Sequence, residues 1–305
     1  MRQVSARGWN GLFAGVLAAC VLVVIGAGIL ALATLIVASA PSIREFGISF
    51  LWIPAWNPLH RQYGALPFLY GSFLTAGIAV LLAGVIGVTT AVALTQIGVR
   101  WLRSVLSLLL EVLAVIPSVV YGVWALLVIV PIIARLTDHQ AGGSVGAFTG
   151  SGFGMLAGGV VLGVMVMPTV VAVTREAIAS APKDIAEAAM ALGATRQETV
   201  ALAVMPFVRK GILGSLYLGL ARAFGEAVAV SLVIGNQPRS GGGLLGRAST
   251  LASMLAHTLS GTVPPLQTAA LYELGLVLFL IAAVFYGLGR SYIAREAISL
   301  GFLPW

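Results

Sequence analysis

Residues 180–210, with the sequence SAPKDIAEAAMALGATRQETVALAVMPFVRK, form the one long polar and amphipathic segment of a strongly apolar chain. Ser180 is suited to accept a hydrogen bond from a first-turn amide, and Pro182 has no amide to leave unpaired in that turn. Asp184 and Glu187 add negative charge where the helix dipole is positive. The segment therefore predicts a helix that starts near Pro182.

A second short helix is predicted after a bend. Gly193 interrupts the helical pattern, and Thr195 and Glu198 have the spacing of a capping box, in which each side chain pairs with the backbone amide of the other residue. Before the bend, small apolar side chains recur at three- and four-residue spacing, at Ile185, Ala188, Ala189 and Leu192. This face suits docking into a groove of another protein or packing on the chain's own membrane helices, and the pattern leaves both open.

Composition places the rest of the chain in a membrane. Of the 305 residues, 59% are hydrophobic and 9% are charged, against roughly 25% charged residues in soluble domains, and the mean hydropathy is +1.04. The single cysteine, Cys20, excludes an intrachain disulfide. The net charge of +7 does not indicate nucleic-acid binding, because the basic residues are spread along the chain without a tract that includes aromatic residues.

The apolar runs predict an all-α integral membrane protein with six transmembrane helices in a single domain, residues 1–305. The predicted spans are residues 12–40, 67–97, about 105–134, about 155–173, 211–234 and 266–288, with outer-side loops at about 41–66, 137–154 and 236–265. Ala38, Ser39 and Ala40 have the pattern of a signal-peptidase site. The first run is longer than the ~7–15 residues of a signal-peptide core, so we expect it to remain as a helix.

The distribution of lysine and arginine predicts the orientation. Eleven of them lie on the side of the two termini and the 180–210 segment: Arg2, Arg7, Arg100, Arg103, Arg175, Lys183, Arg196, Arg209, Lys210, Arg290 and Arg295. Five lie on the opposite side: Arg44, Arg61, Arg135, Arg239 and Arg247. Because basic residues are enriched in cytoplasmic loops, both termini and the 180–210 segment are predicted to be cytoplasmic.

The 180–210 segment resembles the EAA loop of importer-type (type I) ABC permeases. Glu187-Ala188-Ala189, Gly193 after three further residues, and Ala203-Val204-Met205-Pro206 after nine more follow the pattern E-A-A-x3-G-x9-I-x-L-P, with Ala203 in place of isoleucine and Met205 in place of leucine. The resemblance implies a coupling helix that sits in a cleft of a separate ATPase subunit. On this basis the coupling residues are Asp184, Glu187, Ala188, Ala189, Gly193 and Pro206.

Two charges are predicted inside the fifth span. Arg222 and Glu226 are four residues apart, which predicts that they share one helix face and can pair, and Gly219 and Gly225 beside them suit close helix approach. A charge at the centre of a bilayer costs at least about 2.5–3.5 kcal/mol, so such residues usually face a partner or a water-filled path. The pair is therefore either a packing device or part of an oxyanion pathway, in which a guanidinium fork suits a tetrahedral anion.

Other polar residues in the predicted spans have structural explanations. Ser118 and Tyr121 follow Pro117, where they can pair with backbone groups that the proline leaves free or line the pathway. Glu111 and Glu273 lie near the starts of their spans, where we expect a carboxylate to reach the membrane interface.

Four further segments resemble the phosphate-specific ABC permeases of the PstC type, with the PstA type second: GALPFLYGSF at 64–73, EVLAVIPSVVYG at 111–122, RAFGEAVAV at 222–230 and ALYELGLVLFLI at 270–281. The resemblance implies a heterodimer with a PstA-like permease, two PstB-like ATPase subunits and a periplasmic PstS-like phosphate-binding protein. It places the chain in the bacterial inner membrane, and it assigns Arg222 and Glu226 to the substrate pathway. Ser118 and Tyr121 are added to the pathway candidates from their position beside Pro117.

Alternative functions make different demands on the sequence. Neither lysine follows the glycine of a phosphate-binding loop, so ATP and Mg are expected on a partner and no cofactor or metal on this chain. An ion-coupled secondary transporter would use Glu226 as a relay but leaves the 180–210 segment unexplained. An intramembrane hydrolase fits poorly, since His60, His139 and His257 all fall in predicted outer loops. Phosphate is distinguished from sulfate or molybdate only by the resemblance.

Overall fold

The structure, a computed structural model, describes residues 3–96, 100–140, 151–238, 243–258 and 264–299. Within these ranges the regular structure is helical, apart from two isolated β-bridges. Six helical stretches are long and apolar enough to cross a membrane: Phe13–Leu51, Leu66–Gln96, Ser118–Thr137, Met155–Ala179, Arg196–Gly225 and Pro265–Ala294. The predicted all-α class and the predicted number of spans are therefore confirmed.

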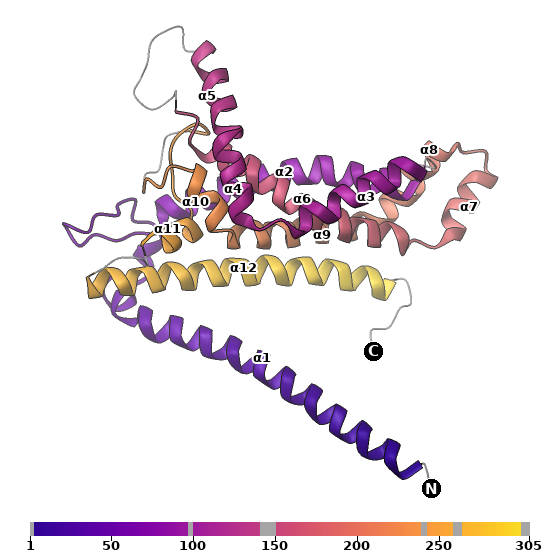
Figure 1. Cartoon of the computed structure of the whole chain (residues 1–305), viewed down its shortest axis with the longest axis horizontal. Helices are drawn as coiled ribbons and strands as arrows, with labels where there is room; N and C mark the ends of the chain where they lie inside the picture. Colours follow the sequence, from indigo (N-terminus) through magenta and orange to yellow (C-terminus); the bar gives the residue numbers. More distant parts are fainter. Residues whose placement is uncertain (1–2, 97–99, 141–150, 239–242, 259–263, 300–305) are drawn as a thin grey trace.

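Four long helices run side by side and form the body of the molecule (Figure 1). They are α2 (Leu66–Gln96), α6 (Met155–Ala179), α9 (Met205–Gly225) and α12 (Pro265–Ser299). α6 packs along α2 and α9, and α9 also packs along α12. α1 (Gln3–Phe46) meets α12 near the end of α1 and diverges from the bundle toward its start (Figure 1). Because α1 has few protein neighbours, its apolar side chains, such as Val24 and Val37, are mostly exposed.

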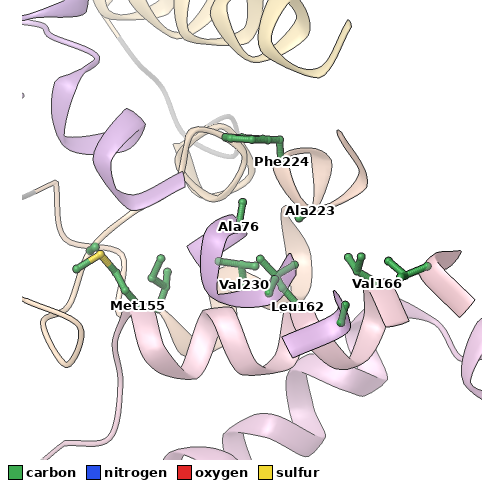
Figure 2. Close-up of a cluster of buried hydrophobic side chains, with 12 residues drawn as sticks. Ala76, Met155, Leu162, Val166, Ala223, Phe224 and Val230 are labelled. Carbon is green, nitrogen blue, oxygen red and sulfur yellow. The ribbon is translucent and has the colours of Figure 1, made fainter. Parts of the chain in front are cut away.

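Small residues bring α2 and α6 close together. Ala76, Ala79 and Ala83 recur at three- and four-residue spacing on α2 and are fully buried. Opposite them, a Cβ atom built on Gly159 would lie 2.6 Å from the Cβ atom of Ile78. Membrane helices commonly associate through such small residues, because the bilayer offers little hydrophobic drive for association. Figure 2 shows the core that results, with Leu162 and Val166 of α6 near Ala76 and Ala223.

The third predicted span, about 105–134, is wrong as one continuous helix. The chain forms α3 (Arg100–Val115), α4 (Ser118–Leu127) and α5 (Ile129–Gln140), and the stretch long enough to span is Ser118–Thr137. Pro117 separates α3 from α4 because a proline has no amide for the helix and its ring clashes with the preceding turn. α3 runs beside the long helices, whereas α5 turns away from them (Figure 1).

The fifth predicted span, 211–234, is also broken. α9 ends at Gly225, Glu226 has an extended backbone, and a short helix, α10 (Val228–Val233), follows. α10 packs on α4, where a Cβ atom at Gly122 would lie 3.0 Å from the Cα atom of Ala229. This close contact is a tertiary interaction that the apolar pattern of the fifth span does not reveal.

The loops predicted on the outer side contain structure of their own. After α1, the 3-10 helix η1 (Gly47–Leu51) leads into a packed aromatic cluster in which Trp56 contacts Tyr63 and Phe68 edge-on, with ring centroids 5.0 and 5.1 Å apart. α11 (Leu251–Thr258) lies within the predicted 236–265 loop. Parts of the loop predictions, residues 141–150, 239–242 and 259–263, lie outside the described residues, as does Arg2.

One end of the bundle carries the 180–210 segment. It forms α7 (Lys183–Ala191), α8 (Arg196–Glu198) and the short π-helix η2 (Thr199–Val204), which continues into α9. α2 ends, α3 begins and α6 ends at this same end, which we call the α7 end. The start of α1 and the end of α12 also point to that side (Figure 1).

Candidate functional site

The helix start predicted in the 180–210 segment is confirmed. α7 begins at Lys183 after Pro182, whose extended backbone (φ −57°, ψ 134°) marks the N-cap, and Asp184 lies in the first turn. The role predicted for Ser180 is wrong, because its hydroxyl donates to the carbonyl of Ala177 at 2.7 Å and so belongs to the end of α6. Proline at the N-cap leaves α7 without a side-chain cap.

Gly193 ends α7 in a Schellman motif. Its φ of +90° lies in the left-handed region, which a residue with a Cβ atom rarely adopts. The amide of Gly193 donates to the carbonyl of Met190 at 3.0 Å, and the amide of Ala194 donates to the carbonyl of Ala189 at 3.1 Å. These are the 5→2 and 6→1 hydrogen bonds that define the motif, so the glycine sets the bend that follows α7.

The predicted capping box is present at the start of α8. The Thr195 hydroxyl accepts from the amide of Glu198 at 3.3 Å, and the amide of Thr195 donates to the Glu198 carboxylate at 2.8 Å. Farther on, Pro206 follows the π-helix η2 in the first turn of α9, so its missing amide removes a bond where the helix changes from π to α geometry. The 180–210 segment therefore has a locally determined shape from Pro182 to Pro206.

The apolar face predicted on α7 is divided between the bundle and the exterior. Ile185 and Ala189 are half-buried and face the chain's own helices, whereas Ala188 is exposed and Leu192 is 91% exposed. Met190, which the sequence pattern does not single out, is 49% exposed beside them. Asp184, Glu187, Gly193 and Pro206 are exposed as well. The α7 end thus presents exposed apolar side chains, Ala188 and Leu192 on one side of α7 and Met190 on another, with carboxylates on the same short helix.

Arg222 lies near the end of α9, away from the α7 end of the bundle. Its side chain is exposed and lines a cavity of about 530 Å³ with residues of α6, α9 and α12, among them Thr169, Leu218 and Tyr286. Gly219, one turn earlier, lets α9 approach α6, because a Cβ atom there would lie 3.0 Å from Val166. A Cβ atom at Gly225 would meet no neighbour within 4 Å, so the close approach predicted there is wrong.

The predicted Arg222–Glu226 pair does not form within this chain. α9 ends at Gly225 and Glu226 follows with φ −80° and ψ 114°, so the two residues do not share one helix face. Both are described residues, and no ion pair within 4.0 Å joins them. Instead, the half-buried Glu226 carboxylate accepts a long hydrogen bond, 3.5 Å, from the amide of Ala229 in the first turn of α10.

Tyr121 interacts both with the backbone at the end of α3 and with Arg222. Its hydroxyl donates to the carbonyl of Leu113 at 2.6 Å. In an unbroken helix this carbonyl would pair with the amide of residue 117, but Pro117 has none, so the tyrosine satisfies the group that the proline leaves unpaired. Tyr121 also lies close enough to the Arg222 guanidinium to interact electrostatically. Ser118 is half-buried at the start of α4.

The two remaining carboxylates differ in environment. Glu111 is exposed on α3. Glu273 is only 7% exposed on α12, and its Oε2 atom has no hydrogen-bond partner, which fits a structural role inside the protein. Among the described residues no three histidine, cysteine or acidic side chains lie together as they would in a metal site.

The chain matches the model of one protein family. Residues 83–296 match the family described as "Binding-protein-dependent transport system inner membrane component". The matched range extends from the middle of α2 through α12 and includes the whole 180–210 segment.

Curated relatives match over most of their length. The chain is 34% identical over 287 residues to the "Phosphate transport system permease protein PstC" of Mesorhizobium japonicum, covering 91% of this chain and 88% of that protein. It is 36% identical to the PstC protein of Haemophilus influenzae (87% and 86% covered) and 36% identical to the "Probable ABC transporter permease protein YqgH" of Bacillus subtilis (93% and 90%). A solved structure of the MetNI methionine ABC transporter has a chain with TM-score 0.52 at 19% identity, covering 78% of this chain and 99% of that one, which shows the fold alone.

Proposed function

Because the chain belongs to the family of binding-protein-dependent transport system inner membrane components, we propose that it is the membrane-spanning permease subunit of an ATP-driven importer of inorganic phosphate. The observation that carries the proposal is similarity over 91% of the chain to a relative named as a phosphate transport permease. The chain itself performs no catalysis. It forms half of the translocation pathway and transmits the energy of ATP hydrolysis from a separate subunit.

We propose that the exposed surface on α7 docks on this ATPase subunit. Leu192 and Met190 supply apolar area, which is the usual anchor of a helix in a groove. The Schellman motif at Gly193 and the capping box at Thr195 hold α7 and α8 at a fixed angle. Motion of the ATPase is then transmitted through η2 into α9, which carries Arg222.

The remaining subunits follow from the family. The complex contains a second, PstA-like permease, two PstB-like ATPase subunits that bind ATP and Mg, and a PstS-like periplasmic phosphate-binding protein. The α7 end faces the cytoplasm, since the excess of lysine and arginine is on that side. Both termini are then cytoplasmic and the membrane is the bacterial inner membrane.

Arg222 is proposed to contact the passing oxyanion. Its guanidinium is exposed in the single chain and has no carboxylate partner in the described residues, so its donors are available to an anion. Tyr121 lies close enough to this guanidinium to interact with it electrostatically. Glu226 follows Arg222 by four residues but does not pair with it within this chain. We include Glu226, and Ser118 at the start of α4, among the proposed pathway residues.

Uptake by the reconstituted complex tests the proposal. Proteoliposomes that contain both permeases and the ATPase, supplied with the binding protein, should accumulate labelled phosphate only when ATP is present on the side of the ATPase. A proton gradient without ATP should give none. Competition by sulfate and molybdate measures the anion preference. Uptake on a proton gradient alone would establish a secondary transporter instead, and stronger competition by molybdate or sulfate than by unlabelled phosphate would reassign the substrate.

A further inference from the structure

A groove at the α7 end contains neither the exposed residues of α7 nor Arg222. Two adjoining cavities, of about 340 and 330 Å³, lie between α3 and α6 and share Ser107 and Arg175 in their walls. The first is also lined by Thr95 and Gln96 at the end of α2 and by Arg103 on α3. The consecutive helices α2 and α3 and the more distant α6 therefore close around this first cavity, which we call the arginine compartment.

The arginine compartment has a positive lining. Arg103 and Arg175 contribute two guanidinium groups, and the cavity walls contain no acidic residue. Arg175 is exposed and has no ion-pair or hydrogen-bond partner among the described residues. Arg103 lies in the first turn of the 16-residue helix α3, but the last turns of α2 and α6 also line the cavity, and their dipoles offset that of α3. The compartment therefore favours an anion through its two guanidinium groups.

The polar groups in the wall of the compartment suit a phosphate group. The Thr95 hydroxyl already donates to carbonyls of its own helix, Ala91 at 2.9 Å and Val92 at 3.1 Å, so it offers only an acceptor. The guanidinium groups and the Gln96 amide supply the donors. Planar guanidinium forks match the oxygen geometry of phosphate, and charge-assisted hydrogen bonds of this kind are the stronger ones in proteins.

The second cavity limits how far an anion can enter. It is lined by Glu111 and Glu176 and, among others, by the apolar residues Leu110, Pro168 and Val171. The two carboxylates repel an anion, so a phosphate group is confined to the arginine compartment. The apolar wall that continues beyond it along α3 and α6 suits a hydrocarbon chain.

The position of the groove places it near the membrane surface. Trp101, which precedes Arg103 by two residues, is 69% exposed. Exposed tryptophan beside arginine is typical of the interface between membrane and water. A phosphate group can therefore reach the compartment either from the aqueous phase or from a lipid of the adjacent leaflet.

We propose that the arginine compartment binds a phosphate group, held by Arg103 and Arg175 at the α7 end of α2, α3 and α6. The group belongs either to inorganic phosphate or to an anionic phospholipid. The site does not include Arg222, so an experiment can support or contradict it independently of the proposed transport pathway.

Two binding measurements on the full chain test the site and distinguish the sources. In nanodiscs of phosphatidylcholine alone, equilibrium binding of [³²P]phosphate is measured for R222Q, which removes the other candidate arginine, and for R222Q combined with R103Q and R175Q. In detergent, native mass spectrometry measures phosphatidylglycerol retained by the wild type and by R103Q/R175Q. R290Q, at an exposed arginine of α12, is the matched control in both.

Loss of two guanidinium contacts should weaken binding by at least about tenfold in one of the two measurements, while R290Q should not change it. Loss of [³²P]phosphate binding identifies free phosphate, and loss of phosphatidylglycerol identifies a lipid head group. R103K/R175K keeps the charge, and so the expected topology, but lacks the planar fork, so binding should fall less. The parent proteins are R222Q for phosphate and the wild type for phosphatidylglycerol. The proposal is overturned if the glutamine and the lysine substitutions at Arg103 and Arg175 both leave binding within twofold of the parent in both measurements. It is also overturned if neither parent binds its probe.

Discussion

The bend between α7 and α8 and the break between α9 and α10 both interrupt helices, but different interactions produce them. At the first, Gly193 and Thr195 satisfy the helix ends with bonds between residues only a few positions apart. At the second, Glu226 leaves the helix and α10 packs on Gly122 of α4, about a hundred residues earlier in the chain. Because the bonds at the bend between α7 and α8 are local, this bend can keep its shape when the segment moves. The break near Arg222 depends on long-range packing, so its shape changes if the packing of the bundle changes.

The largest expected effect separates the two regions by function. Arg222→Gln should reduce ATP-dependent phosphate uptake by the reconstituted complex at least about 100-fold, because charge-assisted hydrogen bonds are worth about 1.5–3 kcal/mol each and the amide replaces more than one. Binding of the ATPase to the 180–210 segment should be unchanged. Arg290→Gln, at an exposed arginine of α12, is the control and should transport normally. Normal uptake by the Arg222 variant would remove it from the pathway.

The next effect tests whether Tyr121 is structural. Tyr121→Phe removes the donor to the Leu113 carbonyl and leaves that group unpaired beside Pro117, which should lower the stability of the complex by about 1–3 kcal/mol. Thermal unfolding in detergent measures the change, and uptake should fall only in proportion to the folded fraction. Tyr70→Phe, at a half-exposed tyrosine of α2, is the control. Unchanged stability with lost uptake would instead assign the hydroxyl to the pathway.

Sequence reasoning succeeds where the determining contacts are local. Pro182, Gly193 and the Thr195–Glu198 capping box are identified correctly because their signals are contained within a few residues. The second span is predicted to within one residue at each end, since a long apolar run with few interruptions admits one interpretation. The prediction for Ser180 fails because a serine suits the end of α6 as readily as the start of α7.

Sequence reasoning fails where tertiary packing decides. The i,i+4 spacing of Arg222 and Glu226 predicts one helix face, but α10 turns toward α4 and takes Glu226 away from the helix. The position of Glu273 near the start of its span does not reveal that the side chain is buried and that one carboxylate oxygen is unpaired. The arginine compartment is also invisible in the sequence, since Arg103 and Arg175 meet only when α3 folds back along α6.

A smaller effect tests the conformation of the first bend. Gly193→Ala meets no atom within 4 Å, so its cost comes from φ +90° alone and should be about 1–2 kcal/mol. That cost should weaken binding of the ATPase about 5- to 30-fold and leave membrane insertion intact. Gly287→Ala, also in open space but in an ordinary helical conformation, is the matched control. Gly193→Asn should recover much of the affinity, because asparagine tolerates this conformation. Equal binding by the alanine and control variants would mean that the bend does not set the docking geometry.

The smallest expected effect addresses the other half of the same bend. Thr195→Ala removes the acceptor for the Glu198 amide at an exposed helix start, where loss of a cap typically costs about 1 kcal/mol. Amide hydrogen exchange should therefore become about fivefold faster in α8, while α9 around Arg222 keeps its protection. Thr34→Ala, at an exposed threonine bonded only to its own helix, is the control. If exchange instead increased together in α8 and α9, the bend would depend on the bundle as the α9–α10 break does, and the distinction between a locally fixed and a packing-fixed interruption would fail.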